Sequence, residues 1–231
     1  MRVGGIIFDY GGTLDSRGDH WSEVIWRAYV AERSGVERER FREAYVYAER
    51  ALEGSGIILP GDNFLELMRK KIALQTARLG IDSPTLTEAV AQRCYESARE
   101  CVGESAVTLR EISRRYPLAV VSNFYGNIRA VLDDFGILPL FKAVIDSTEA
   151  GIRKPDPAIF RLGADALGLE PQDVLVVGDS IGKDILPARS LGCRTALLPG
   201  TPWDPSREQP TVPDDTVTLS ALSDLAGLVL Q

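Results

Sequence analysis

Polar side chains that could form a catalytic site follow several short apolar runs in this sequence. Asp9 comes directly after the first run, Ser122 and Asn123 follow a second, and Asp179 follows a third, with Asp184 five residues later. Short apolar runs of this kind are typical of buried parallel strands. In an open parallel sheet, ligands bind at the carboxyl ends of the strands, so we expect these side chains to meet at one edge.

Lys154, in the sequence Lys-Pro-Asp-Pro, lies on the loop after the third predicted strand and should join this group. Three partly buried carboxylates call for a divalent cation, and hard carboxylate oxygens favour Mg²⁺ over zinc. Mg²⁺ and Lys154 together would balance the charges of Asp9, Asp179 and Asp184. The site could then still accept an anionic group such as phosphate.

The rest of the chain predicts an α/β fold interrupted by a helical segment. Helices are expected from residue 21 and over 36–53, 63–79 and 85–101, and no strand pattern interrupts them. After Gly103, short strands alternate with helices of about ten residues, which indicates βαβ units. Expected strands are 3–8, 118–121, 143–145, 174–177, 194–198 and 217–219, and expected helices are 107–115, 128–135, 158–167, 185–191 and a last one from Leu222. Residues 199–215, rich in Pro and Asp, should form a surface loop.

The predicted architecture is therefore a Rossmann-like parallel-sheet core, residues 1–15 and 103–231, with an all-helical cap, residues 16–102, inserted after the first strand. The motifs within it resemble those of the haloacid dehalogenase-like (HAD) hydrolase superfamily, in the subgroup with a helical C1-type cap. Four motifs carry the resemblance, in order and over nearly the whole chain. They are Asp9-Tyr10-Gly11-Gly12-Thr13-Leu14-Asp15, then Ser122, then Arg153-Lys154-Pro155-Asp156-Pro157, then Gly178-Asp179-Ser180 with Asp184.

The resemblance implies a role for each matching residue. Asp9 would be the nucleophile that forms a covalent aspartyl intermediate. Ser122 and Lys154 would hold the transferring group, and Asn123 and Gly12 are predicted to contact the substrate. Mg²⁺ would be bound by Asp9, the backbone carbonyl of Gly11 and Asp179, with Asp184 supporting these ligands from outside or acting through water. The cap would close over the site and select the substrate, a small phosphorylated metabolite.

One position departs from the family pattern. Phosphatases of this family carry a second Asp two residues after the nucleophile, as general acid and then general base, and this chain has Gly11 there. A backbone carbonyl can still bind the metal, but the proton-transfer group is missing. Such a group is typically worth about 10²–10⁴ in rate. The sequence therefore predicts a weakened phosphatase.

Three interpretations of Gly11 remain open. In the first, a phosphatase takes its proton from elsewhere, with Asp15, Asp19, His20 or a cap carboxylate as candidates, although an exposed position is the plainer interpretation of His20. In the second, the enzyme cleaves a carbon–halogen or carbon–phosphorus bond. The carbon–phosphorus version needs a Schiff-base lysine, for which Lys70 and Lys71 are the adjacent cap lysines. In the third, the protein binds a phosphorylated ligand or a partner with little turnover.

Composition narrows the class of protein. The 231 residues carry 26 Lys and Arg against 33 Asp and Glu, and this net charge of −7 argues against binding to nucleic acid or an anionic membrane. The sequence contains no apolar run of roughly 18 residues, as a membrane span would need, and no secretory leader is expected. The three cysteines lack metal-ligand spacing and are interpreted as reduced thiols. We therefore expect a cytoplasmic protein; its oligomeric state is not encoded in these patterns.

Overall fold

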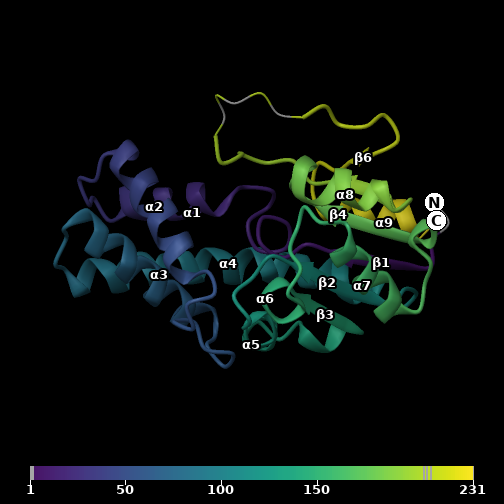
Figure 1. Cartoon of the computed structure of the whole chain (residues 1–231), viewed down its shortest axis with the longest axis horizontal. Helices are drawn as coiled ribbons and strands as arrows, with labels where there is room; N and C mark the ends of the chain where they lie inside the picture. Colours follow the sequence, from purple (N-terminus) through teal and green to yellow (C-terminus); the bar gives the residue numbers. More distant parts are fainter. Residues whose placement is uncertain (1–2, 205, 207, 209, 231) are drawn as a thin grey trace.

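The computed structural model describes residues 3–204, 206, 208 and 210–230. Their centre is a parallel sheet of six strands in the order β3-β2-β1-β4-β5-β6 (Figure 1). The strands are β1 (Gly5–Phe8), β2 (Leu118–Ser122), β3 (Ala143–Asp146), β4 (Val174–Gly178), β5 (Arg194–Leu197) and β6 (Val217–Thr218). The prediction of a parallel α/β core is confirmed.

The sheet is buried on both faces because its strands are apolar at nearly every position. Successive side chains of a strand point to opposite faces, so Ile6 and Phe8 pack into one cluster and Ile7 into another. The core helices that cover the two faces are α5 (Ile128–Asp134), α6 (Ser147–Ala150), α7 (Ala158–Leu167), α8 (Leu186–Ser190) and α9 (Asp224–Val229). The predicted helix over 185–191 is preceded by a π-helical turn, Ile181–Ile185, which the sequence analysis did not anticipate.

Four helices between β1 and β2 form the cap: α1 (Trp21–Ala31), α2 (Arg38–Leu52), α3 (Phe64–Leu79) and α4 (Pro84–Ile112). The chain specifies their starts locally. Asn63 and Glu66 form a reciprocal capping box at α3, and Ser83 accepts a hydrogen bond at the start of α4, where Pro84 occupies the first turn. The predicted cap insertion after the first strand is confirmed.

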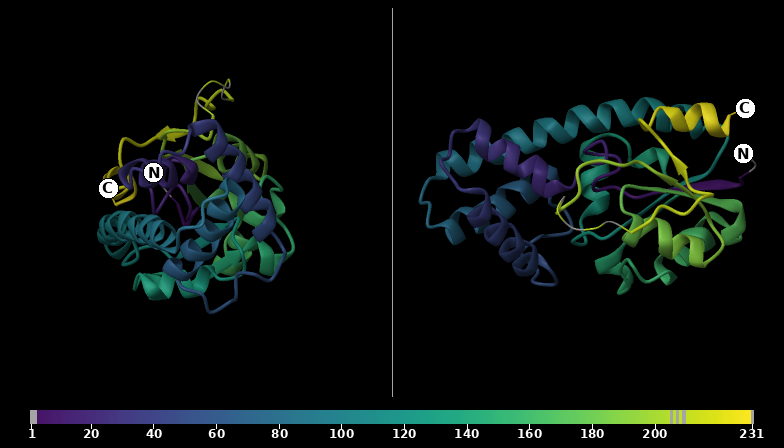
Figure 2. Two further views of the ribbon diagram at one scale, coloured as in Figure 1. Left: turned by 90° about the vertical axis from the view of Figure 1, so that its left-hand side faces the viewer. Right: turned by 90° about the horizontal axis from the view of Figure 1, so that it is seen from above.

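The expected break near Gly103 is wrong, because α4 runs through it as a single helix of 29 residues. Its buried stripe continues at helical spacing on both sides of the glycine, through Ala98, Val102, Ser105 and Leu109. This burial outweighs the roughly 1 kcal/mol that a glycine costs within a helix. Figure 2 shows α4 alongside both the cap and the core, where it packs against α9. The proposed domain boundary at residue 103 thus falls within a helix, and the division into domains stays a prediction.

No helix among the described residues is both long and apolar enough to cross a membrane. The long α4 carries charged residues along its length. The three cysteines are all buried as free thiols.

The strand order places β1 between β2 and β4, where the chain winds outward in both directions. Phe8 pairs with Val120 on one side and Val177 on the other. The residues that follow these strands therefore emerge side by side at the carboxyl edge of the sheet. This is the position at which doubly wound sheets bind their ligands.

Candidate active site

Asp9 and Lys154 form a buried ion pair at the carboxyl edge of the sheet. Lys154 Nζ donates to Asp9 Oδ1 at 2.7 Å and to Asp184 Oδ1 at 2.6 Å, and its side chain is 2% exposed. Burial by itself would lower the pKa of Lys154, but the charges of Asp184 and Asp9 outweigh it and raise that pKa. Lys154 is therefore a permanent cation that bridges two carboxylates.

Lys154 reaches this position because the end of β2 holds its loop. The Asn123 side chain accepts from the Lys154 N–H at 2.8 Å and donates to the Lys154 carbonyl at 3.0 Å. Ser122, the last residue of β2, is buried and lines the same cavity as Asp9. The structure thus brings Ser122 to the cavity and gives Asn123 a positioning contact. Its predicted contact with substrate stays a prediction.

Asp179 approaches the loop after β1 so closely that only glycine fits there. Gly12 has a φ of +102°, and a Cβ at this position would lie 2.5 Å from the Asp179 carboxyl carbon. Thr13 Oγ1 donates to Asp179 Oδ1 at 3.2 Å. The Gly12 N–H donates to Asp15 Oδ1 at 2.8 Å, so the peptide group predicted to bind substrate already has a partner within the loop.

Asp184 is turned toward the site by the π-helical turn after β4. The N–H of Ser180 donates to Asp184 Oδ2 at 3.0 Å, and both Asp184 and Ile185 donate their N–H groups to the Ser180 carbonyl. A Cβ at Gly178 would lie 2.4 Å from the Asp184 Cβ, so the glycine of this motif makes room for the carboxylate.

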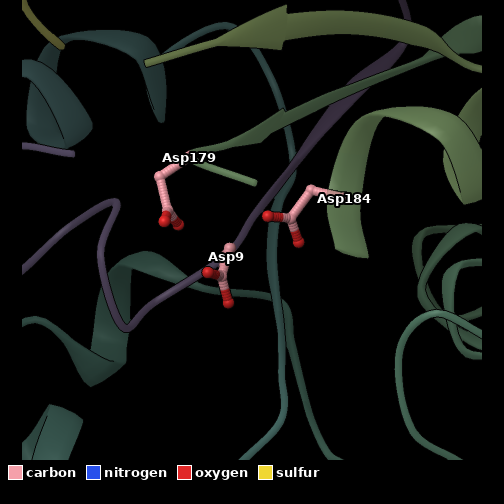
Figure 3. Close-up of side chains that lie close together, drawn as sticks. All are labelled: Asp9, Asp179 and Asp184. Atoms are coloured by element: carbon pink, nitrogen blue, oxygen red, sulfur yellow. The ribbon is translucent and has the colours of Figure 1, made fainter. Parts of the chain in front are cut away.

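The carboxylates of Asp9, Asp179 and Asp184 face one another in Figure 3. One oxygen of each lies within 4.8 Å of the others, which is a separation that one metal ion can bridge. Burial, followed by the charges of Asp9 and Asp184, raises the pKa of Asp179 well above its usual range. Lys154 alone does not balance three carboxylates, so these residues fit a hard divalent cation. The structure bears out the expected acidic cluster, and the identity of the ion belongs to the proposal below.

These residues form the floor of a cavity of about 550 Å³ between the core and the cap. The cap contributes a second ion pair to it, which the sequence analysis did not identify. Lys71 Nζ donates to Glu49 Oε1 at 2.7 Å, and Tyr125 of the core donates to Glu49 Oε2 at 2.5 Å. Lys71 is one of the two adjacent cap lysines that the sequence offers for a Schiff base, and the sequence does not predict its pairing with Glu49. The other, Lys70, pairs with Asp62 instead.

The start of the predicted surface loop also lines the cavity, through residues 199, 200 and 202–204. It is tied to the loop before α1, since the N–H of His20 donates to the Thr201 carbonyl and the N–H of Thr201 donates to Asp19 Oδ1. No pattern in the sequence connected these segments, which lie about 180 residues apart. Only the fold places them together.

The four candidates for the missing proton donor can now be compared. Burial raises the pKa of Asp15 to about 7, but both of its oxygens accept hydrogen bonds, from Gly12 and from Trp21 Nε1. Asp19 accepts the Thr201 N–H and forms an ion pair with Arg27. Burial alone would raise the pKa of Asp19, but these two interactions outweigh it and lower the pKa.

The remaining two candidates are no better placed. Burial lowers the pKa of His20 to about 4, and its Nδ1 accepts the N–H of Ser22 as the cap of α1. His20 is half-buried, so the expectation of an exposed residue is wrong. In the cap carboxylate Glu49, the charge and hydrogen bond of Lys71 outweigh burial and lower the pKa. Among the described residues, none of the four candidates is therefore a free acid beside Gly11.

The fold and the four motifs agree with what comparison with known proteins shows. The family model described as haloacid dehalogenase-like hydrolase matches residues 3–192. This chain belongs to the haloacid dehalogenase-like hydrolase family. The predicted resemblance is confirmed.

Individual relatives give a similar picture over part of their length. The chain is 34% identical over 125 residues to haloacid dehalogenase-like hydrolase domain-containing protein 3 of Danio rerio, covering 52% of each chain. It is 38% identical over 97 residues to phosphoserine phosphatase of Thermus thermophilus, covering 41% of this chain and 40% of that one. The chain thus spans about half the length of these curated relatives. A crystal structure of a dehalogenase with an intermediate complex superimposes with a TM-score of 0.67 at 18% identity, covering 100% of this chain and 98% of that one, and shares the HAD fold.

Proposed function

We propose that this HAD hydrolase is a Mg²⁺-dependent phosphatase of small phosphorylated metabolites, with Asp9 as its nucleophile. The supporting observation is the position of Asp9 on the cavity floor, bonded to Lys154 and within metal-bridging distance of Asp179 and Asp184. Phosphoserine phosphatase of Thermus thermophilus, similar over part of this chain, acts on a substrate of this class by its name.

In this mechanism an oxygen of Asp9 attacks phosphorus while the bond from phosphorus to the leaving oxygen breaks, giving an aspartyl phosphate and an alkoxide that takes its proton from water. Lys154, which is bonded to Asp9, stabilises negative charge on the transferring group. Ser122, at the end of β2, would hold that group from the other side. Water then hydrolyses the aspartyl phosphate and regenerates Asp9.

Mg²⁺ would be held by Asp9, Asp179 and the backbone carbonyl of Gly11, with Asp184 supporting it. When bound, the ion supplies the positive charge that offsets three carboxylates and the incoming phosphate. Asp184 already accepts hydrogen bonds at both oxygens, from Lys154 and from Ser180, which suits a supporting role better than that of a primary ligand.

The absence of a side chain at Gly11 would weaken turnover. An alcohol that is a poor leaving group needs a proton as it departs, and none of the four candidate acids is free to provide it. The expected loss is about 10²–10⁴ in rate, or roughly 3–5 kcal/mol of barrier. We therefore propose a phosphatase that favours substrates with good leaving groups.

The structure favours phosphoryl transfer over the alternatives. A Schiff base requires a neutral lysine, whereas the charge of Glu49 outweighs burial and raises the pKa of Lys71, the cap lysine that lines the cavity. Loss of halide needs no metal ion and would leave the acidic cluster around Asp179 without a purpose. The low-turnover binding protein differs from the phosphatase only in rate, which the following experiment measures.

The test is a screen of phosphate esters, phosphonates and 2-haloacids, each with Mg²⁺ and with EDTA. We expect phosphate release that depends on Mg²⁺ and is lost in Asp9→Asn and Asp179→Asn. The control Asp133→Asn, which removes an exposed carboxyl on α5, should retain it. Release of halide, or of phosphate in the presence of EDTA, contradicts the proposal. Saturable binding of esters without any product supports the binding protein instead.

A further inference from the structure

Aromatic side chains are concentrated on the cavity walls above the catalytic residues. Six of the 17 Phe, Trp and Tyr residues of the chain line this one cavity. They come from α1, α2, α3, the loop after β2 and the segment after β5: Trp21, Tyr45, Phe64, Phe124, Tyr125 and Trp203. Walls of this kind are more apolar than a sugar phosphate or a phosphorylated amino acid requires.

The rings pack in pairs that fix their positions before any ligand binds. The Tyr45 and Trp203 centroids are 5.1 Å apart at an interplanar angle of 31°, and the ring of His20 lies within 6 Å of both. Trp21 packs against Phe64 at 5.2 Å. Rings at these separations attract one another and offer flat surfaces to a third ring.

The charges on the cap side of the cavity are already paired. Glu49 balances Lys71 and also accepts from Tyr125. The Lys71 ammonium lies 5.0 Å from the Tyr125 ring centroid and 5.8 Å from that of Tyr45, so a protein cation occupies the position that a cationic ligand would take over these rings.

The catalytic end does not attract a second anionic group either. Asp9, Asp179 and Asp184 outnumber the cations there, Lys154 and the exposed Lys183 on the turn after β4. Bound Mg²⁺ and one phosphate would use the positive charge that is available. The part of the substrate that faces the cap is therefore expected to carry no charge of its own.

We infer that the cap cavity recognises an uncharged aromatic ring carried on the leaving group of the phosphorylated substrate. This inference rests on the proposed function for the placement of the phosphate at Asp9. Tyr45, Trp203 and Trp21, which line the cavity, would contact the ring. A single aromatic contact of this kind changes affinity by a factor of up to about ten.

The test compares benzylphosphonate with cyclohexylmethylphosphonate, which present a flat and a non-aromatic ring of similar size on the same anion. Binding to the whole chain with Mg²⁺ is measured by calorimetry, so that no turnover is needed. We expect a Kd about tenfold lower for the benzyl compound. Equal Kd values overturn the inference, and so does tighter binding of choline phosphate, which would indicate a cationic group.

Two variants locate the preference. Trp203→Leu should reduce it to less than about threefold, because Trp203 lies in a loop and lines the cavity. Tyr47→Leu, on the exposed face of α2 and outside the cavity, is the matched control and should leave it unchanged. A preference that survives Trp203→Leu contradicts the inference.

The inference and the proposed function can fail separately. An aromatic preference in binding, with no phosphate ester hydrolysed, refutes the phosphatase but supports the aromatic cavity. Hydrolysis of benzyl phosphate and cyclohexylmethyl phosphate with equal KM supports the phosphatase and overturns the aromatic cavity.

Discussion

Substitution of Gly11 by Asp should supply the proton-transfer group that is missing from the proposed mechanism. Gly11 borders the cavity beside Asp9, and a Cβ built there would lie 3.8 Å from Trp21 Cδ1, an ordinary van der Waals separation. Gly11 also does not have the positive φ of its neighbour Gly12, so a side chain causes no backbone strain. The variant is therefore expected to fold normally.

The magnitude follows from what the leaving group needs. Phenyl phosphate and benzyl phosphate both carry an aromatic ring, but phenoxide departs with little help, whereas the benzyl alkoxide must be protonated. A positioned acid contributes about 10²–10⁴ in rate, and mainly for the poorer leaving group. We expect Gly11→Asp to raise kcat for benzyl phosphate about 10²-fold or more, and kcat for phenyl phosphate less than about tenfold.

The assay is Mg²⁺-dependent phosphate release from both esters, for the wild-type chain, Gly11→Asp and Gly61→Asp. Gly61 lies in the cap loop with no atom within 4 Å of a Cβ, so Gly61→Asp adds the same charge away from the cavity. The reasoning is refuted if the wild-type chain hydrolyses the two esters at similar kcat, since another acid would then be in place. The reasoning is also refuted if Gly11→Asp leaves the ratio of kcat for benzyl phosphate to kcat for phenyl phosphate unchanged.

Three further predictions concern the metal cluster and its surroundings. Gly12→Ala should abolish the stabilisation of the fold by Mg²⁺, because the new Cβ collides with Asp179. At a Mg²⁺ concentration a hundred times Kd, this stabilisation is worth about 2.7 kcal/mol in thermal unfolding. The control Gly35→Ala, at a glycine with positive φ but open surroundings, should retain the stabilisation. Lys154→Met should lower the free energy of unfolding, measured by urea titration in EDTA, by about 3–5 kcal/mol, because two buried carboxylates lose their cation. Mg²⁺ should restore part of the lost stability. Burial raises the pKa of Asp15 to about 7, so the folded state holds a proton that the unfolded chain releases near pH 4. Proton binding therefore stabilises the folded state at low pH, and this stabilisation is lost as pH rises toward 7. Relative to Asp15→Asn, wild-type stability in EDTA should therefore fall by up to about 4 kcal/mol between pH 4 and 8, and parallel pH profiles would contradict this.

The sequence by itself determined the architecture of the core and the residues at its carboxyl edge. Apolar runs that end in Asp9, Ser122 and Asp179 predict buried strands, and parallel strands bring their carboxyl ends to one edge. The helix starts were equally local, as in the capping box at Asn63, since the residues that form them are neighbours in the chain.

Sequence rules failed where tertiary packing competes with local preference. Gly103 lowers helix propensity, yet α4 continues through it because its buried stripe packs on the cap and then on the core. The π-helical turn before α8 places Asp184 against Gly178, and the apolar periodicity of the sequence did not predict this turn.

Only the tertiary structure decided which side chains line the cavity. Lys71, Glu49 and Tyr125 come from two cap helices and a core loop, and Trp203 comes from a segment with no regular structure. None of them belongs to a motif, because a cavity wall requires only that side chains from distant segments face the same space. The acidic cluster around Asp9 is encoded at strand ends and can be recognised in the sequence, whereas the cavity walls exist only once the cap has folded over it.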